Sequence, residues 1–351
     1  MSRRRLEAAI LAGQQIEQGK SWPQQYTGMQ IIKEVYFDID SLGPVYSLQY
    51  SYDGESLAVG FGNGAIRLYE SRTGEFIKEL RKPRYGGLQI MCLRFHTKVH
   101  HILLASTADG KVFECNTKDD SIAEVISEKG NEINCLDFDI DGLSFATGGK
   151  DLAIRIYDAK TYKILNTYKG FSIKENHSEI DSAGCSMRVF ALKYHPEIEN
   201  IFVTGGWDSH LKIWDDRCVD GQAVVRTIHG PHICGDSLDI KGYEILTGSW
   251  RKKDALQIWD YSSGKVKTEV NFELGGCDGS YLYCGQFCDN DVIMAAGSGT
   301  KSCEAINRNT GKMVGEVKFD KAVIAMDTVA GGRLFACGGE DKKFVLGALS
   351  D

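Results

Sequence analysis

The pentapeptide Leu-Lys-Ile-Trp-Asp at residues 211–215 returns as Leu-Gln-Ile-Trp-Asp at residues 256–260, 45 positions further along the chain. Each copy follows an apolar run that ends in Thr-Gly, at residues 202–206 and 245–248. Apolar runs this short, bounded by glycine, are typical of β-strands rather than helices. The pair therefore indicates a repeated unit built from several short strands.

Outward from this pair, a strand-like hexapeptide with one small residue at its centre occurs seven times. Successive central residues are 45, 43, 56, 46, 47 and 41 positions apart, and they are Ser47, Cys92, Cys135, Ala191, Ser237, Cys284 and Ala325. In five copies an Asx residue that favours a turn lies six positions before the end of the third strand. These residues are Asn63, Asp109, Asp151, Asp208 and Asp341.

A four-strand unit of roughly 40–45 residues that ends in Ile-Trp-Asp resembles the WD40 repeat. The resemblance extends from about residue 43 to residue 351. Seven such units imply an all-β fold, a seven-bladed WD40 β-propeller. Closing the ring covers faces that a single four-stranded unit would leave exposed.

The last unit supplies only three strands, at residues 323–329, 334–337 and 343–349. In the WD40 family an N-terminal strand commonly completes the last blade, and we assign Gln30 to Tyr36 to that role. The predicted domains are an N-terminal arm at 1–28, partly helical or flexible, and one propeller at 29–351. A short helix is expected over 5–18, and the arm is interpreted as a flexible tail, a partner-binding helix or a mitochondrial presequence.

Composition places the chain among globular proteins and sets limits on its partners. The 351 residues include 39 Gly but only 5 Pro, which suits many tight turns between strands. The net charge of −7 disfavours general binding to nucleic-acid phosphates, and no apolar run is long enough to span a membrane. The 11 cysteines include no C-x-x-C pair and no secretory signal precedes them, so reduced thiols in the cytoplasm are expected, with the cytoskeleton, cilium or nucleus as alternatives.

The resemblance also implies a buried hydrogen-bond network of His, Ser or Thr, Asp and Trp in each strong repeat. Repeat four offers Thr204, Asp208 and Trp214, with His177 as a further member. Repeat five offers Thr247 and Trp259, with His229 or His232. A catalytic triad would use the same residue types, but their recurrence at fold-defining positions favours a structural role.

Two further groups carry alternative interpretations. His96, His100 and His101 have spacing that would suit a metal on a helix, but they follow a strand, so a solvated turn is favoured. Asp137, Asp239 and Asp327 each lie two residues after a central small residue. They are expected to be solvated or to accept backbone hydrogen bonds, with a cation in the central channel as the alternative.

In this family the loops that join blades and the turns between second and third strands share one face, the top. Trp207 and Trp250 occupy equivalent places there in adjacent repeats. Basic and aromatic residues in two loops are expected on the same face, and Trp, Tyr and Arg are the types enriched in binding hot spots. The loop residues are Arg81, Lys82, Arg84 and Tyr85 before repeat two, and Arg251, Lys252 and Lys253 in repeat five. A long loop at 169–187 accounts for the 56-residue spacing.

We therefore expect a monomeric propeller with no cofactor and no catalytic centre, which acts as a scaffold or adaptor subunit and binds other proteins through its top face. One alternative is a propeller that reads acidic peptides through basic top loops, such as cytoskeletal or ciliary tubulin tails or phosphopeptides. Another is an enzyme with its active site in the channel, which would need converging titratable groups or a metal.

Overall fold

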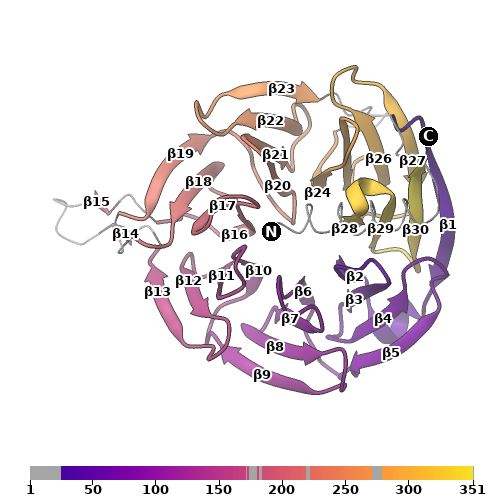
Figure 1. Ribbon diagram of the computed structural model, residues 1–351, viewed down its shortest axis with the longest axis horizontal. Helices are drawn as coiled ribbons and strands as arrows, with labels where there is room; N and C mark the ends of the chain where they lie inside the picture. The colour runs from indigo at the N-terminus through magenta and orange to yellow at the C-terminus, as the bar shows by residue number, and fades with distance from the viewer. Residues whose placement is uncertain are drawn as a thin grey trace.

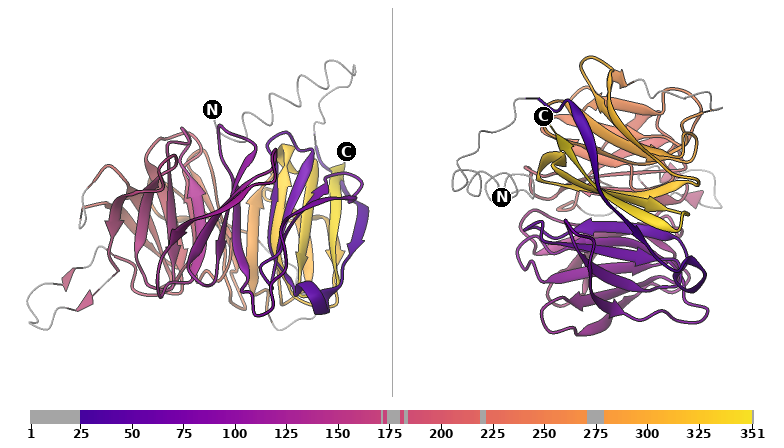
Figure 2. Two further views of the ribbon diagram at one scale, coloured as in Figure 1. Left: turned by 90° about the horizontal axis from the view of Figure 1, so that it is seen from below. Right: turned by 90° about the vertical axis from the view of Figure 1, so that its right-hand side faces the viewer.

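The computed structural model describes residues 25–170, 172–173, 180–181, 184–218, 222–270 and 279–350. These residues form seven four-stranded antiparallel sheets, which lie side by side as the blades of a ring (Figure 1). Seen from the edge, the ring is a disc whose thickness is spanned by single strands (Figure 2). The predicted all-β, seven-bladed propeller is confirmed.

Each of the first six blades takes its strands from consecutive stretches of chain, with the first strand innermost. Blade one contains β2 (Val45–Tyr50), β3 (Ser56–Phe61), β4 (Ile66–Glu70) and β5 (Phe76–Arg81). Blade two contains β6 (Ile90–Phe95), β7 (Ile102–Thr107), β8 (Lys111–Asn116) and β9 (Ile122–Ser127). Blade three contains β10 (Ile133–Phe138), β11 (Ser144–Gly149), β12 (Ile154–Asp158) and β13 (Ile164–Tyr168). Blade four contains β16 (Val189–Tyr194), β17 (Ile201–Gly206), β18 (His210–Asp215) and β19 (Val224–His229). Blade five contains β20 (Leu238–Lys241), β21 (Glu244–Gly248), β22 (Leu256–Asp260) and β23 (Val266–Val270). Blade six contains β24 (Leu282–Phe287), β25 (Val292–Gly297), β26 (Ser302–Asn307) and β27 (Met313–Lys318).

The last blade joins the two ends of the chain. It contains β28 (Val323–Val329), β29 (Leu334–Gly339), β30 (Lys343–Ser350) and, outermost, β1 (Gly28–Tyr36). β1 runs antiparallel to β30, from the Gly28–Ser350 pair to the Tyr36–Lys343 pair. The predicted closing strand is therefore present, and it begins two residues earlier than the sequence suggested.

The packed part of the chain begins before residue 29, the predicted start of the propeller. Tyr26 is buried, and its hydroxyl donates a hydrogen bond to the carbonyl of Gly331 at 3.2 Å. Gly331 lies in the short 3-10 turn η1 (Ala330–Gly332) between β28 and β29. Residues 1–24, which include the predicted helix, lie outside the described residues.

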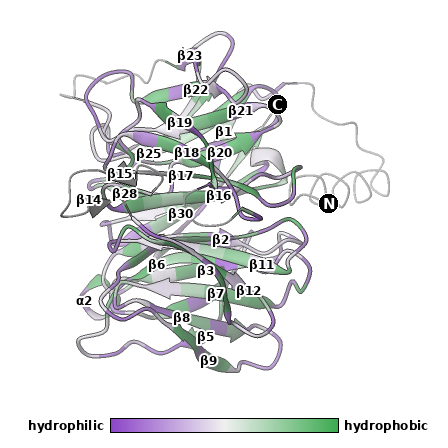
Figure 3. Cartoon of the chain, turned by 90° about the vertical axis from the view of Figure 1, so that its left-hand side faces the viewer, coloured by the Kyte–Doolittle hydropathy of each residue, from purple (hydrophilic) through white to green (hydrophobic). Residues whose placement is uncertain are grey.

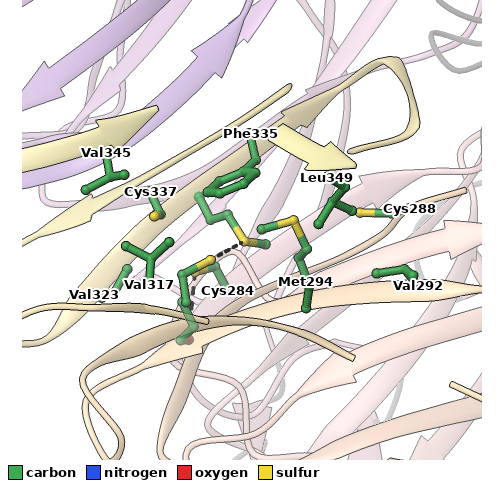
Figure 4. Close-up of a cluster of buried hydrophobic side chains, with 14 of the residues drawn as sticks. Cys284, Cys288, Val292, Met294, Val317, Val323, Phe335, Cys337, Val345 and Leu349 are labelled. Carbon is green, nitrogen blue, oxygen red and sulfur yellow. Dashed lines mark hydrogen bonds between the residues drawn. The ribbon is translucent and has the colours of Figure 1, made fainter. Parts of the chain in front are cut away.

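The hydrophobic core is divided among the contacts between blades. Each of the buried apolar clusters in the described residues draws side chains from two neighbouring blades. The cluster between blades six and seven is rich in sulfur, with Cys284, Met294 and Cys337 packed around Phe335 (Figure 4). Figure 3 shows the hydrophobic segments mainly in the strands, which also contain hydrophilic segments, whereas the turns are largely hydrophilic. A blade buries its apolar faces only when both of its neighbours are present.

Small residues at the centre of the inner strands allow blades to approach closely. The Ser47 hydroxyl donates to the carbonyl of Ile90 in the next blade at 2.9 Å. Gly148 at the end of β11 serves the same purpose, because a Cβ there would lie 3.0 Å from Cγ1 of Val189 in blade four. The repeated small residues found in the sequence thus mark contacts between blades.

The connection between blades three and four contains the 56-residue spacing. Its described parts include a short two-stranded ribbon, β14 (Ser172–Ile173) paired with β15 (Ile180–Asp181). A single turn of helix, α2 (Ile39–Leu42), connects β1 to β2, and Asp38 caps its N-terminus by accepting the Asp40 amide. No helix in the described residues is both long and apolar enough to cross a membrane.

Candidate functional site

The loops that join blades and the turns between second and third strands lie together on one face, the top face. In blade one, the amide of Arg84 before β6 donates to the carbonyl of Asn63 in the β3–β4 turn at 3.5 Å. In blade five, the amide of Trp250 donates to the carbonyl of His232, in the loop before β20, at 2.8 Å. These bonds hold the top loops against one another.

A cavity of about 270 Å³ opens at the centre of this face, among the inner strands. In six blades the second residue of the inner strand lines it, because side chains alternate along a strand and this position faces the axis. These residues are Tyr46, Met91, Asn134, Phe190, Tyr283 and Ile324. In blade five Asp236, just before β20, lines the cavity, and Glu340 of blade seven lies at its rim. We call this space the top cavity.

Arg94 on β6 forms the floor of the top cavity. Its side chain also lines a smaller cavity of about 80 Å³ formed by later residues of the inner strands, so it separates the two spaces. The Arg94 guanidinium pairs with Asp236 at 2.6 Å and with Asp137 at 3.4 Å. Burial by itself lowers the pKa of Arg94, but the surrounding negative groups, with the carboxylates of Asp236 and Asp137 among them, together outweigh burial and hold that pKa above its ordinary value.

Trp207 and Trp250 contact residues that line the top cavity and are 36% and 40% exposed. The Trp207 indole donates to Sγ of Cys234 at 3.1 Å and packs against Phe190, with ring centroids 5.2 Å apart. The Trp250 indole donates to the Tyr283 hydroxyl at 3.1 Å. The Arg188 guanidinium also lies over the Trp207 ring, 5.4 Å from its centroid. Both rings are therefore fixed in orientation while part of each remains exposed.

The basic turn of blade five divides into two kinds of side chain. Arg251 donates to the carbonyls of Asp254 and Gly230 and, at 2.6 Å, to Oε1 of Gln257, so it holds its own loop together. Lys252 and Lys253 are exposed. Of the three predicted cations, only the two lysines extend toward solvent.

The connection between blades one and two differs from the expectation at one residue. Arg81 was expected to be accessible to a partner, but it is 8% exposed, stacks over the Phe113 ring at 4.5 Å and donates to the Gly64 carbonyl. Burial lowers the pKa of Arg81. Arg81 therefore packs between blades one and two, whereas Lys82, Arg84 and Tyr85 are exposed as expected.

The hydrogen-bond pairs implied for repeats four and five are present, without all of their expected members. The Trp214 indole donates to the Thr204 hydroxyl at 2.8 Å, and the Trp259 indole donates to the Thr247 hydroxyl at 2.9 Å. Asp208 accepts from the backbone amide of Ser186 at 3.2 Å. His177 lies outside the described residues.

The two histidines considered for repeat five have other neighbours. The His229 ring lies 3.4 Å from His210, measured between Nδ1 and Nε2. The His232 ring lies 3.4 Å from the Ser209 hydroxyl, measured from Nδ1. Both contacts are to the turn and third strand of blade four rather than to Thr247.

Blade three contains a buried network that the sequence reading missed, because its centre is a glutamate rather than a histidine. Glu128 accepts hydrogen bonds from Thr147 at 2.6 Å, Tyr157 at 2.9 Å and Asn131 at 2.6 Å. It also pairs with Arg155 at 2.8 Å. Tyr157 aligns with Trp214 when the repeats are compared, and this alignment could have revealed the network from the sequence.

The three histidines considered in blade two lie between β6 and β7, in the turn that the sequence predicted. Nδ1 of His96 accepts the backbone amides of Lys98 and Val99 at 3.1 and 3.2 Å, which caps the turn after β6. The His100 ring stacks on Tyr52, with centroids 4.8 Å apart. No group of three or more His, Cys, Asp or Glu side chains placed to hold a metal occurs in the described part of the chain.

The three inner-strand aspartates bind backbone amides of the next blade. Asp137 accepts from Tyr194 at 2.9 Å, Asp239 from Phe287 at 2.8 Å and Asp327 from Tyr50 at 2.7 Å. Each bond links the inner strands of neighbouring blades. This confirms the backbone-bonded interpretation of these carboxylates.

Comparison with protein families finds WD repeats in three stretches of the chain. The model described as "Anaphase-promoting complex subunit 4 WD40 domain" matches residues 33–98. The model described as "WD domain, G-beta repeat" matches residues 122–158 and 181–215. The first stretch begins within β1, the outer strand of blade seven, and the three stretches otherwise lie between α2 and the third strand of blade four.

Three curated relatives match between 43% and 72% of this chain. "Cell division cycle 20.1, cofactor of APC complex" of Arabidopsis thaliana is 27% identical over 259 residues, 72% of this chain and 52% of that protein. "WD repeat-containing protein slp1" of Schizosaccharomyces pombe is 27% identical over 269 residues, 72% of this chain and 48% of that protein. "Pre-mRNA-processing factor 19" of Mus musculus is 30% identical over 155 residues, 43% of this chain and 26% of that protein.

The chain spans about half the length of the first two relatives. The matched WD stretches, these relatives and the blades together show that the chain is a WD40-repeat protein that folds as a seven-bladed β-propeller.

Proposed function

We propose that this propeller is a non-catalytic adaptor that binds partner proteins within a multi-subunit assembly. The observation that carries the proposal is a group of aromatic side chains beside the top cavity, which we call the aromatic arc. The arc consists of Phe190, Trp207, Trp250, Tyr281 and Tyr283. Trp250 packs against Tyr281 with ring centroids 5.0 Å apart, and both tryptophan indoles are hydrogen-bonded.

Exposed aromatic rings held in one orientation are suited to protein binding. They present a large apolar area, and they lose little conformational entropy when a partner covers them. Isolated exposed apolar residues need no explanation, but a clustered group beside a cavity does. The fixed geometry of the arc therefore supports a docking surface more than a packing function within the blades.

The relatives support the same class of function. The Arabidopsis protein is named as a cofactor of the APC complex. By analogy, we propose that this chain also acts with other proteins rather than on a small substrate. We further propose that it does so in the cytoplasm or nucleus, where the buried thiols of its cores would stay reduced.

Recognition of acidic peptides, including tubulin tails, has weaker support from the geometry. Arg81 is buried and Arg251 is bound to its own loop. The remaining cations lie in the β5–β6 connection and the β21–β22 turn, on opposite sides of the ring (Figure 1). They form two separate small groups rather than one basic surface.

A pull-down from cell extract with the Trp207→Ala/Trp250→Ala double variant tests the adaptor proposal. We expect the variant to fold, since both rings are partly exposed, and to lose partners that the natural protein captures. The matched control is Tyr243→Ala, because Tyr243 is 67% exposed in the β20–β21 turn on the opposite face. Retention of every partner by the double variant would show that the aromatic arc is not the docking surface.

A further inference from the structure

We propose that the top cavity receives one lysine or arginine side chain from the partner. This inference rests on the proposed docking at the top face and names the chemistry of its central subsite. Three features carry it: the size of the cavity, the nature of its walls, and the balance of charge at its floor and rim. Each is a property of described side chains.

The walls suit a long side chain with an apolar stem. Tyr46, Met91, Phe190, Tyr283 and Ile324 surround the cavity and are all half-buried. A volume of about 270 Å³ accommodates one large side chain but not a folded element. Lysine and arginine bury their methylene stems against such surfaces while their heads seek polar groups. Aromatic rings add attraction for a cation that passes over their faces.

The charges favour a cation over an anion. The floor holds one guanidinium, from Arg94, between the carboxylates of Asp236 and Asp137. The Asp236 side chain is 40% exposed and lines the cavity, and Glu340 adds a second carboxylate at the rim. Among the described side chains that line the top cavity, the two carboxylates of Asp236 and Glu340 outnumber the one guanidinium of Arg94, which leaves a net negative environment at the end of an apolar-walled space. An incoming ammonium or guanidinium restores the balance, whereas an incoming carboxylate or phosphate increases the imbalance.

A series of short peptides on the unaltered protein tests the chemistry. The probes are acetyl-Gly-Ala-Xaa-Ala-Gly-amides in which Xaa is arginine, lysine, norleucine or glutamate. Binding is followed through the indole N–H resonances of Trp207 and Trp250 in ¹⁵N-labelled protein. We expect saturable shifts with arginine and lysine, and on the order of tenfold weaker binding of norleucine, which has the stem without the charge.

Each other outcome overturns the proposal in a definite way. Equal binding of norleucine would show that the cavity recognises an apolar chain, and stronger binding of glutamate would show an anion site. Absence of shifts with arginine and lysine up to about 10 mM would show that no cation subsite exists, because even single-residue contacts register in that range. Added salt should weaken the arginine and lysine peptides but not norleucine.

Three variants locate the effect within the cavity. Asp236→Asn should weaken the arginine peptide on the order of tenfold, by loss of a charge-assisted hydrogen bond. Glu340→Gln at the open rim should weaken it about twofold to threefold. The control is Asp254→Asn, which makes the same change in an exposed part of the β21–β22 turn away from the cavity and should leave affinity unchanged. Circular dichroism checks the fold of Asp236→Asn, and Glu340→Gln decides the matter if that variant is unfolded.

The two proposals can fail separately. If the double tryptophan variant loses partners while Asp236→Asn and Glu340→Gln retain them, the docking surface stands and the cation subsite is wrong. If the arginine peptide binds but the double tryptophan variant keeps every partner, the cavity binds cations and the aromatic arc is not the adaptor surface.

Discussion

At the scale of single residues, the inner-strand aspartates show how one side chain joins two blades. Asp239 accepts the Phe287 amide of blade six through Oδ2 and the Ile240 amide of its own strand through Oδ1. Gln286 joins blades six and seven in the same way, because its Oε1 accepts the backbone amide of Thr328 at 2.9 Å. These buried amides would otherwise lack an acceptor, so the polar side chains of the inner ring are structural.

Replacing Asp239 with alanine should therefore destabilise the whole ring. The change removes both charge-assisted hydrogen bonds and leaves the Phe287 amide buried without its partner. We expect a loss of about 1.5–3 kcal/mol in the free energy of unfolding, measured by urea denaturation. Asp320→Ala, at an exposed position, is the control. Equal midpoints for the two variants would contradict the proposed bond between blades.

A second residue-scale effect concerns pH. Burial raises the pKa of Asp216 to about 6, although the Tyr194 hydroxyl donates to its Oδ2 at 2.9 Å. Since the folded pKa lies above the unfolded value of 3.8, the stability linked to this group is complete below that value and is lost as pH rises through about 6. Burial also raises the pKa of Asp139. Asp139 is present both in the natural protein and in a variant at Asp216, so it does not account for a difference between them.

Asp216→Asn should remove this loss while keeping an acceptor for Tyr194. The advantage of the variant over the natural protein in unfolding free energy should grow between about pH 5 and about pH 7.5. Urea midpoints at the two pH values measure it, and Asp320→Asn should show no such trend. An advantage that shrinks with rising pH would mean that Asp216 titrates in the opposite sense.

At the scale of elements, β1 contributes more to the stability of the ring than its mostly exposed residues suggest. It is paired along its length with β30, and its Val35 side chain is buried in the core between blades seven and one. Phe37, just after the strand, packs on Phe61 with ring centroids 5.2 Å apart. Without β1, β30 would present an open edge and that core would lose part of its cover.

Two truncations test the contribution of β1. Deletion of residues 1–24 leaves Tyr26 and the full β1–β30 pairing in place, so the melting temperature should change little. Deletion of residues 1–37 removes the outer strand of the last blade, and the cost should exceed the marginal stability of a domain. Soluble yield and thermal melts distinguish the two. A stable, soluble 38–351 fragment would show that ring closure does not need β1.

At the scale of the whole molecule, the ring is cooperative because no blade has a core of its own. Each apolar cluster belongs to a pair of neighbours, and the cluster between blades seven and one is completed by residues near the two ends of the chain. Opening any one interface exposes faces of two blades. Linear repeat arrays can unfold from their ends, whereas a closed ring has no end from which to begin.

Unfolding followed by two probes should therefore coincide. In a Trp22→Phe variant, the remaining tryptophans all lie in blades four and five, whereas far-UV circular dichroism reports all strands. We expect superimposable urea curves for the two signals, as all-or-none unfolding requires. Separated curves would show that blades four and five unfold independently of the rest of the ring.

Features that depend on local sequence patterns could be predicted, whereas contacts between residues far apart in the sequence could not. The seven repeats were readable because strand period, turn residues and small central residues are local patterns. The ring of seven blades and the closing function of the N-terminal strand were implied by the resemblance of these repeats to the WD40 family. The predicted accessibility of Arg81 was wrong, because its burial depends on Phe113 in the next blade, 32 positions away in sequence. The Glu128 network was missed because it satisfies the same hydrogen-bonding need with different residue types.

The sequence by itself determined that this chain is a seven-bladed WD40 ring, since the pattern of each strand depends on its own few residues. Only the tertiary structure decided which side chains meet at the centre of the top face. Arg94 reaches Asp236 across 142 positions of sequence, and the cavity above them is lined by inner strands from around the ring. No local pattern contains such a juxtaposition, because the closure of the ring creates it.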